Sequence, residues 1–560
     1  MKTKKVMAML LCAAMGLSLL SGCGNDGEEV KTSTQEPQQS EVAEKPAEEP
    51  VEETVEEVVE EVAEELSGTI TVCVPARAGA EEGWKAVSVA YREMHPDVDI
   101  VIDLKDSESY ADWVTTVVNS TDPAVDIAEF GLGNASALDM LDYADYLDLE
   151  SPYSGGIWRD QFDATAVGTS LVTGEQDTLS LNSTQVMWMY NVEIFEKAGV
   201  EPPETWDELI AVCEKLQAAG YQPITIDGDY FSFTTMTFKW LTQVYTDQIT
   251  RSLINVYRAQ EGDYCYDPDI DGAWSYDVND PWNDATSEVT QNIVRVVAAC
   301  KDGTYSLDTE ENAAMWTNFA KVFPGYAGGE AMFGTGFDNV ANVFYQGKAA
   351  MMINGGWGII DYMRMMEEFK ESGSYVNENG EEISGEIFTL GTFSMPSMTG
   401  DAFEAEARTI EGPTQNLTVL SKDQEHNDLV MDFMMYYSSA EGMSIYLEAL
   451  LGAGGIIDGP VLVHDVVYPE EIAKAFEEVE YLGSVANGYA NVFATGVPYV
   501  EESAREFYNN TYSYFMGEIE TDEFLDRAQE NMDTYLPGLM QILNISDADA
   551  ENPAAAPAGF

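Results

Sequence analysis

Basic residues and histidines are scarce in this sequence. It has 26 lysine and arginine residues against 100 aspartate and glutamate residues, three histidines and a formal net charge of -74. Nucleic-acid binding needs clustered cations that neutralise phosphates, and docking on anionic lipid needs a basic surface. The composition therefore excludes nucleic acid as a partner and argues against direct adsorption to anionic membranes. Such acidity is typical of a highly soluble protein, and attraction of cationic ligands is the second interpretation.

Catalytic motifs and cysteine pairs are missing as well. The three histidines stand far apart and form no H-E-x-x-H pattern, and the chain contains neither G-x-S-x-G nor a G-x-x-x-x-G-K-[ST] loop. None of the six cysteines belongs to a C-x-x-C pair, so no zinc motif or disulfide framework is predicted, although a Cys265–Cys300 bridge stays open. We expect a protein that is not an enzyme. Carboxylate pairs that cleave glycosides are the alternative that so many acids leave open.

One acidic turn raises the question of a bound cation. Asp267, Asp269 and Asp271 follow the pattern D-x-D-x-D-G, which begins an EF-hand calcium loop. The twelfth position is Val278 instead of a bidentate glutamate, so the pattern is incomplete. We expect an acidic surface turn and no cofactor, with calcium at these three aspartates as the alternative.

The first 23 residues are predicted to be a targeting signal. A basic start precedes the apolar run Val6–Leu20, which is too short to span a bilayer stably. The run ends in Leu-Ser-Gly-Cys, which resembles the bacterial lipobox and implies lipidation of Cys23. Residues 24–67 are acidic, lack aromatic residues and are predicted to form a disordered linker. We expect a lipid-anchored protein of the cell membrane that faces the extracellular side.

From Gly68 onward the pattern changes to that of an α/β protein. Strand-like alternation and helical periodicity follow one another, which predicts a parallel sheet with helices on both faces. Open sheets of this kind place ligands at the carboxyl edge of the strands. The predicted strands are 69–75, 98–104 and 125–130, and the predicted helices are 82–94, 109–120 and 135–146.

The stretch Leu181–Gly220 carries the most detailed signal. An apolar strand at 186–190 leads into a short helix that Gly199 is placed to end. Two prolines follow, and Thr205 with Glu208 forms a T-x-x-E capping box at the start of the next helix. This succession resembles a segment of bacterial extracellular solute-binding proteins.

Three later runs resemble the same family, in the order that the family has them. They are Phe344–Trp357, the strand and helices between Gly412 and Gly442, and Gly517–Leu525. The chain is thereby identified as a member of solute-binding family 1, whose maltodextrin-binding-protein-like members are carbohydrate-binding lipoproteins of ABC transporters. The resemblance implies an α/β, two-lobed periplasmic-binding-protein (type II, Venus-flytrap) fold, with parallel-sheet-centred lobes joined by a hinge. Projected onto this chain, lobe one is 68–181 plus 415–452, lobe two is 182–414 plus 453–546, and 547–560 is a loose tail.

The resemblance also implies where a ligand would bind. A sugar offers C–H faces and hydroxyl groups, so its site needs flat rings and bidentate polar side chains. Arg77 departs from the polar pair of maltodextrin binders and could instead meet an anionic sugar, and Tyr499 is the ring nearest to the family's late aromatic position. The remaining positions that match family contacts are the rings Phe130, Tyr230, Phe231 and Trp357 and the polar residues Asn182, Thr184, Gln185 and Asp229.

The function that follows is uptake of a sugar. The resemblance implies a monomer that binds a sugar or oligosaccharide between its lobes and delivers it to the transmembrane subunits of an ABC permease. A binder of another solute on the same fold, such as a polyamine, a peptide or a metal, is the first alternative. A secreted glycan-degrading lipoprotein is the second.

Overall fold

A computed structural model describes most of the chain beyond the predicted linker. The predicted signal peptide with Cys23, nearly all of the linker, Phe130 and Asp269 lie outside the described residues. No helix within the described part is both long and apolar enough to cross a bilayer. The described residues are 66–106, 109–110, 113–114, 117, 124–129, 140–168, 176–268, 270–284, 288–376, 382–477 and 494–557.

The first sheet has the strand order β2-β1-β3-β13-β5-β4. The pairs β1–β2 and β1–β3 are parallel, and β13 joins this parallel unit in the antiparallel direction. The strand–helix–strand prediction at the start of the fold is confirmed, because α2 (Ala80–Met94) connects β1 to β2. The strands are β1 (Gly68–Pro75), β2 (Val98–Lys105), β3 (Ile127–Glu129), β4 (Val167–Gly168), β5 (Thr178–Leu179) and β13 (Leu417–Val419).

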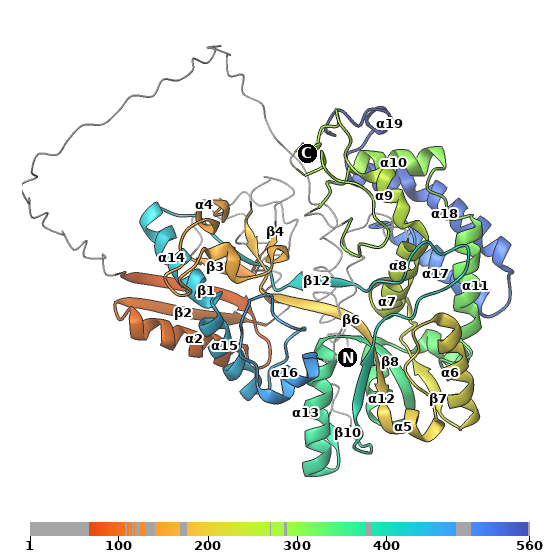
Figure 1. Cartoon of the computed structure of the whole chain (residues 1–560), viewed down its shortest axis with the longest axis horizontal. Helices are drawn as coiled ribbons and strands as arrows, with labels where there is room; N and C mark the ends of the chain where they lie inside the picture. The colour runs from red at the N-terminus through yellow and green to blue at the C-terminus, as the bar shows by residue number, and fades with distance from the viewer. Residues whose placement is uncertain are drawn as a thin grey trace, which may run out of the picture.

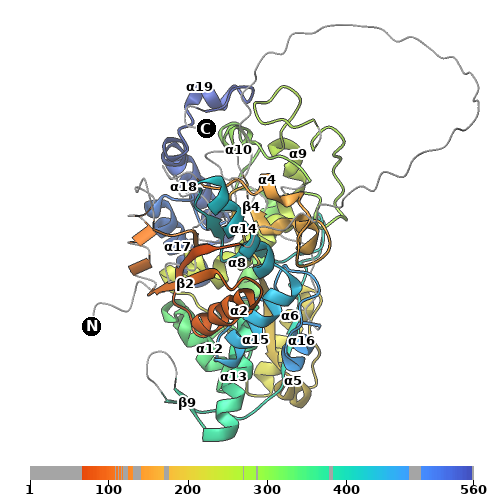
Figure 2. The same cartoon turned by 90° about the vertical axis from the view of Figure 1, so that its left-hand side faces the viewer.

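Helices from both ends of the chain cover this sheet. In Figure 2, α2 and α15 (Ala440–Gly452) lie against each other on the side facing the viewer. Trp84 on α2 stacks on Tyr437 of α14 (Gln424–Tyr437), with ring centroids 4.6 Å apart. Burial of such apolar side chains between helices and sheet is the main stabilising term of this half of the molecule.

The second sheet has the order β11-β6-β8-β7 and is mixed, since only β7 and β8 are parallel. Every residue of β8 is buried, as expected for a central strand covered on both faces. The strands are β6 (Asn182–Asn191), β7 (Gln222–Thr225), β8 (Ala349–Gly355), β11 (Leu390–Phe393) and β12 (Glu411–Thr414).

Strand β6 belongs to both halves of the molecule. Its first residues pair with β12, and its later residues pair with β8 and β11. Figure 1 shows β6 and β12 running between the two halves. A further segment lies beside this hinge, since Val461 forms a bridge with Asn182. The protein therefore has two lobes, and β6 and β12 cross between them at the hinge. We call the halves built on the first and second sheets lobe one and lobe two.

One predicted boundary differs from the packing. Ile457, Val463 and Ile472 belong to the hydrophobic core of lobe one, although the sequence placed residues from 453 onward in lobe two. Their contacts with the lobe-one core explain the difference, because the chain does not leave this lobe at α15. The same core includes α16 (Glu470–Glu477) through Ile472.

The local signals at the start of lobe two are confirmed. Thr205 accepts a hydrogen bond from the Glu208 N–H at 3.3 Å, and the Glu208 carboxylate accepts one from the Thr205 N–H at 3.1 Å. Gly199 ends the preceding helix with a φ of 65°, which a glycine adopts without strain. These helices are α5 (Val192–Ala198) and α6 (Trp206–Ala218).

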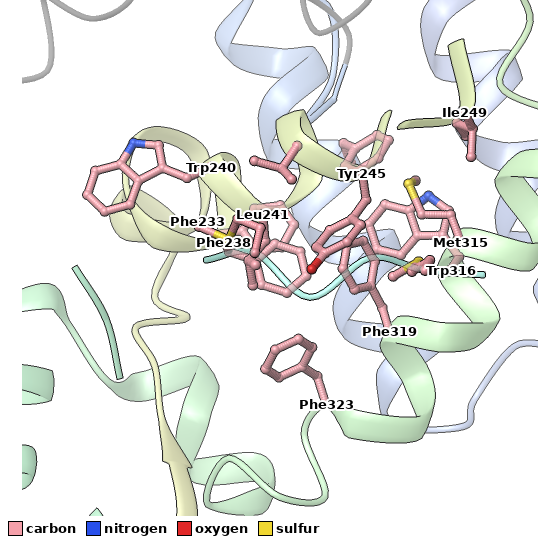
Figure 3. Packing of buried hydrophobic residues seen from close by; sticks show 14 of the residues in the cluster. Phe233, Phe238, Trp240, Leu241, Tyr245, Ile249, Met315, Trp316, Phe319 and Phe323 are labelled. Atoms are coloured by element: carbon pink, nitrogen blue, oxygen red, sulfur yellow. The ribbon is translucent and has the colours of Figure 1, made fainter. Parts of the chain in front are cut away.

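The core of lobe two is rich in aromatic residues. Phe238, Trp316 and Phe319 pack with further rings between helices, while Trp240 lies apart at one edge of the cluster (Figure 3). At this edge, Trp240 packs against side chains that lie outside the centre of the core. The helices of this lobe include α7 (Tyr230–Thr235), α8 (Thr237–Thr250), α10 (Ile293–Asp302), α11 (Glu310–Val322), α12 (Phe337–Tyr345), α13 (Trp357–Ser372), α17 (Glu501–Phe515) and α18 (Thr521–Ile542).

A buried ion network fixes the chain just before β12. The Arg408 guanidinium donates to Asp284 at 2.5 and 3.0 Å and also pairs with Asp247. Asp247 also accepts from Arg251 at 2.7 Å. All four side chains are buried, so each charge depends on its partners. The network holds the segment that enters the hinge.

The predicted loose tail is ordered as far as residue 557. Ser546 and Asp549 form a capping box that begins α19 (Asp547–Ala550), and Ala550 is buried in the core of lobe two. The Pro553 carbonyl accepts a hydrogen bond from the Tyr264 N–H at 3.1 Å. The sequence prediction relied on the small residues and prolines and missed the capping box in front of them.

Candidate functional site

Five rings of lobe two stand in two packed groups, which together we call the ring wall: Tyr230 with Tyr508, and Trp240 with Phe337 and Trp357. Tyr230 packs edge-on against Tyr508 with centroids 5.5 Å apart. Trp240 packs edge-on against both Phe337, at 6.3 Å, and Trp357, at 6.1 Å. All except Trp240 are half-buried, so each offers part of its ring to solvent or to a ligand.

Backbone contacts join the two groups of the ring wall. The Asp229 N–H donates to the Thr335 carbonyl at 3.1 Å, which places the start of α7 beside the start of α12. A Cβ on Gly336 would lie only 3.1 Å from Asp229 Oδ2. The Asp229 carboxylate therefore sits between the Tyr230 group and the Phe337 group of the ring wall.

Asp229 also determines how Tyr230 and Phe231 are presented. Its Oδ1 accepts a hydrogen bond from the Ser232 N–H at 2.8 Å and caps α7. The two rings are thus the first residues of a capped helix. Phe231 is half-buried and packs on the core of lobe two, whereas Tyr230 packs on Tyr508. Burial raises the pKa of the Tyr230 hydroxyl, so it stays protonated and can donate a hydrogen bond.

A cation lies on the free face of Tyr230. The Arg505 guanidinium carbon is 4.2 Å from the ring centroid, and its nitrogen pairs with Glu501 at 2.6 Å. The ring that contacts Tyr230 from α17 belongs to Tyr508, and Tyr499, the predicted ring, is 54% exposed just before that helix. Tyr508 and Arg505 lie three residues apart and so share one helical face, a spacing that could have identified both.

Two glycines set the position of Trp357. A Cβ on Gly355 would lie 2.0 Å from the indole ring, so the ring folds back over this residue. A Cβ on Gly356 would lie 2.6 Å from the Asp458 carbonyl oxygen. Any larger residue at either position would displace the ring or the neighbouring segment at Asp458 and Gly459. Trp357 therefore lies where lobe two meets the hinge.

Polar residues of lobe one and the hinge form what we call the polar floor: Arg77, Glu129, Asn182, Gln415 and Asp458. Arg77 donates two hydrogen bonds to Glu129, at 2.7 and 2.6 Å. Asn182 donates to Gln415 at 3.2 Å, and Gln415 donates to Asp458 at 3.4 Å. The backbone of Asp458 in turn approaches Gly356, which brings the floor next to Trp357.

The polar floor borders a small cavity. Its volume is about 20 Å³, which is room for about one water molecule, and its walls contain Arg77, Glu129, Asn182 and Gln415. Apolar side chains such as Trp84 line the rest. The sequence predicted Arg77 and Asn182 as site residues but missed Glu129, Gln415 and Asp458, whose proximity arises only from the tertiary fold.

Two further predicted residues lie inside the hinge. Thr184 and Gln185 are 1% and 3% exposed and stand opposite Gly412 and Glu411 in the β6–β12 ladder. A ligand would reach them only if this ladder opened. Their ligand contacts stay a prediction, whereas their structural role in the hinge is clear.

The electrostatics of Arg77 bear on the prediction that this residue could meet an anionic sugar. Burial alone would lower the pKa of Arg77, but the Glu129 carboxylate raises it above its usual value. The charge is therefore fixed and already compensated by a bidentate partner. This guanidinium is held in an ion pair with Glu129, and its contact with an anionic sugar stays a prediction.

The acidic turn offers no complete cation site among the described residues. Asp271 is buried, and its carboxylate accepts hydrogen bonds from the N–H groups of Thr290, at 2.8 Å, and Asp267, at 2.9 Å. Within the described ranges no cluster of three or more metal-ligating side chains occurs. Asp269 lies outside them, so the predicted surface turn and its alternative, a calcium site, both stay predictions. Cys265 and Cys300 are both buried and form no disulfide with each other.

Comparison with known proteins identifies the family. Residues 77–444 match the family model described as bacterial extracellular solute-binding protein. This range is more than half of the 560 residues, and the chain belongs to that family.

Solved structures support the fold. A family 1 extracellular solute-binding protein from Bifidobacterium longum subsp. infantis is 16% identical, with a TM-score of 0.50 over 84% of this chain and 100% of its own. The cyclic alpha-maltosyl-1,6-maltose binding protein from Arthrobacter globiformis is 15% identical, with a TM-score of 0.51 and the same coverage. At this identity the likeness concerns the two-lobed fold alone.

Proposed function

We propose that this chain is the sugar-binding subunit of an ABC importer and that it holds a sugar or oligosaccharide between its two lobes. The observation that carries the proposal is the meeting of the ring wall with the polar floor at the hinge. Rings from lobe two would stack on the C–H faces of a sugar, and the floor would bind its hydroxyl groups.

The energy that such a site must supply is modest. Micromolar affinity corresponds to about -8 kcal/mol. Each stacked ring adds roughly 1 kcal/mol beyond its buried area, and each net hydrogen bond adds about 1 kcal/mol. Two or three half-buried rings and a few floor contacts suffice. Because the two sets belong to different lobes, a ligand that touches both would favour closure about the hinge.

The proposed cellular setting follows from the sequence and the family. Lipidation of Cys23 would anchor the protein on the outer face of the membrane, and residues 24–67 would act as a spacer. A monomer would then pass its sugar to the transmembrane subunits of the permease. Solute-binding family members capture ligands, so we assign no catalytic step.

A ligand panel tests this function. The mature chain is titrated by calorimetry with neutral oligosaccharides of three units built from glucose, xylose, galactose or mannose. We expect one-site binding of at least one of them. A thermal-shift screen without response to any carbohydrate would remove the proposal.

A polyamine is the second candidate. Asp229 and Glu501 lie at the ring wall, and Arg505 already shows that a cation can rest on the Tyr230 face. Spermidine carries amines that would suit such a combination of carboxylates and rings. A spermidine titration that releases more heat than every sugar would favour this alternative.

A further inference from the structure

Both arginines that border the site are already paired with carboxylates. Arg77 forms two hydrogen bonds with Glu129 in the polar floor, and Arg505 pairs with Glu501 beside the ring wall. The carboxylates come from different elements, since Glu129 ends β3 and Glu501 begins α17. Neither guanidinium therefore presents an uncompensated positive charge to a ligand.

The Arg77 side chain of the polar floor is nevertheless accessible to a ligand. The Arg77 side chain is 40% exposed and Glu129 is 15% exposed, so Arg77 is accessible while its partner is largely covered. Glu129 uses two of the five N–H donors that a guanidinium carries. The remaining donors can reach neutral hydroxyl oxygens without breaking the ion pair.

The surrounding charges oppose a further anion. Asp458 of the floor and Asp229 of the wall add two carboxylates to Glu129 and Glu501, against the two arginines. A sugar carboxylate would have to displace Glu129 from Arg77 or lie beside an excess of negative charge. Either choice weakens binding in a partly desolvated site.

We propose that the site selects uncharged sugars and rejects uronic acids, with Glu129 as the residue that sets this selectivity. The inference rests on the proposed sugar-binding function and narrows its substrate class. Glu129 acts by occupying Arg77, which turns a potential anion-binding group into a fixed donor for hydroxyl groups.

One nearby lysine is the competing source of positive charge. Lys239 lies on α8 beside Trp240 and is half-buried, and among the described residues no carboxylate pairs with it. If it pointed into the site, a uronate could bind there despite Glu129. The experiment therefore includes this residue.

The test compares matched ligands on the mature wild-type chain. Calorimetry measures the neutral trisaccharide that binds best and its counterpart with carboxylates at C6. We expect the uronate to bind at least about 100-fold more weakly, a difference of about 2.7 kcal/mol. Equal or tighter binding of the uronate would overturn the inference, whereas absence of binding by every carbohydrate would remove the sugar-binding function itself.

Variants then test the role of Glu129. Glu129→Gln should reduce the ratio of the uronate and neutral-sugar dissociation constants at least about tenfold. The reason is that the neutral amide no longer compensates the Arg77 charge. Asp148→Asn, which removes the exposed partner of Arg159 in the same lobe, should leave the ratio of the two dissociation constants unchanged. An unchanged ratio in a folded Glu129→Gln protein would contradict the assignment. Wild-type uronate binding that Lys239→Gln abolishes would also contradict it.

Discussion

The ring wall and the polar floor differ in how their side chains are held. The rings stand on helices of lobe two and lean on one another, so their positions follow from packing. The floor residues come from the ends of strands and from crossings, and they are held by hydrogen bonds and an ion pair. On the proposed function, the wall would provide most of the contact area with a sugar, while the floor would provide direction and selectivity.

The two lobes also differ in how the charged groups near the site are compensated. In the floor Arg77 and Glu129 compensate each other, whereas lobe two contains Asp227, which is fully buried near the ring wall. Asp227 lies beside Thr237 at the start of α8, whose hydroxyl and backbone N–H act to lower the pKa of the carboxyl group. Burial outweighs them and raises the pKa of Asp227 to about 6. A buried carboxylate that is incompletely compensated destabilises the folded protein when it is charged.

The largest expected effect is on the free energy of unfolding, and it comes from the Asp227 carboxylate. Because its folded pKa is raised, native Asp227 keeps its proton when the unfolded chain has lost it, and stability falls as pH rises from about 4 to about 6. Asp227→Asn should therefore stabilise the protein by up to about 3 kcal/mol near pH 7.5, and the gain should disappear near pH 4. Denaturant unfolding of both proteins at these two pH values measures it.

The control is an exposed aspartate. Asp145→Asn changes a side chain on the surface of lobe one and should shift stability little at either pH. A gain from Asp227→Asn that is equal at both pH values would show that ionisation is not its cause.

The next effect concerns the wall where it meets the floor. Trp357→Ala removes the ring that folds over Gly355 and should weaken sugar binding about 30- to 100-fold, or about 2–3 kcal/mol. Calorimetry with the best trisaccharide measures the loss. Trp357→Phe keeps an aromatic face and should recover most of the affinity, and equal losses in both variants would argue against stacking.

A smaller loss is expected at the other end of the wall. Tyr230→Ala should weaken binding about tenfold, since one stacked ring is worth about 1 kcal/mol. Tyr535→Ala, which removes a half-buried tyrosine from α18, serves as the matched control. If both substitutions changed affinity alike, the effect of Tyr230 would come from lobe stability and not from ligand contact.

The sequence predicted the local parts of this arrangement well. The capping box of Thr205 and Glu208, the β1–α2–β2 unit and the turn before Trp357 are encoded by neighbouring residues, so short patterns predict them. Tyr230 was predicted from its match to a family stacking position, and its contact with a ligand stays a prediction.

The floor could not be predicted in this way. Arg77 and Glu129 are 52 positions apart, and Asp458, which approaches Gly356, is more than a hundred positions further along the chain than Gly356. No periodicity links such residues, since their contact is created by sheet order and by the return of the chain through the hinge. Tyr508 packs against Tyr230 because of the face of α17 on which it lies, which distance along the sequence does not show. Ligand contact at Tyr499 stays a prediction.

The central claim is that one sugar touches the wall and the floor together. Calorimetry of the best trisaccharide with wild type, Trp357→Ala, Arg77→Gln and the double variant tests it directly. We expect each single variant to lose at least about tenfold in affinity, or about 1.4 kcal/mol. A single variant from either lobe that binds as tightly as wild type would contradict a ligand held between the two.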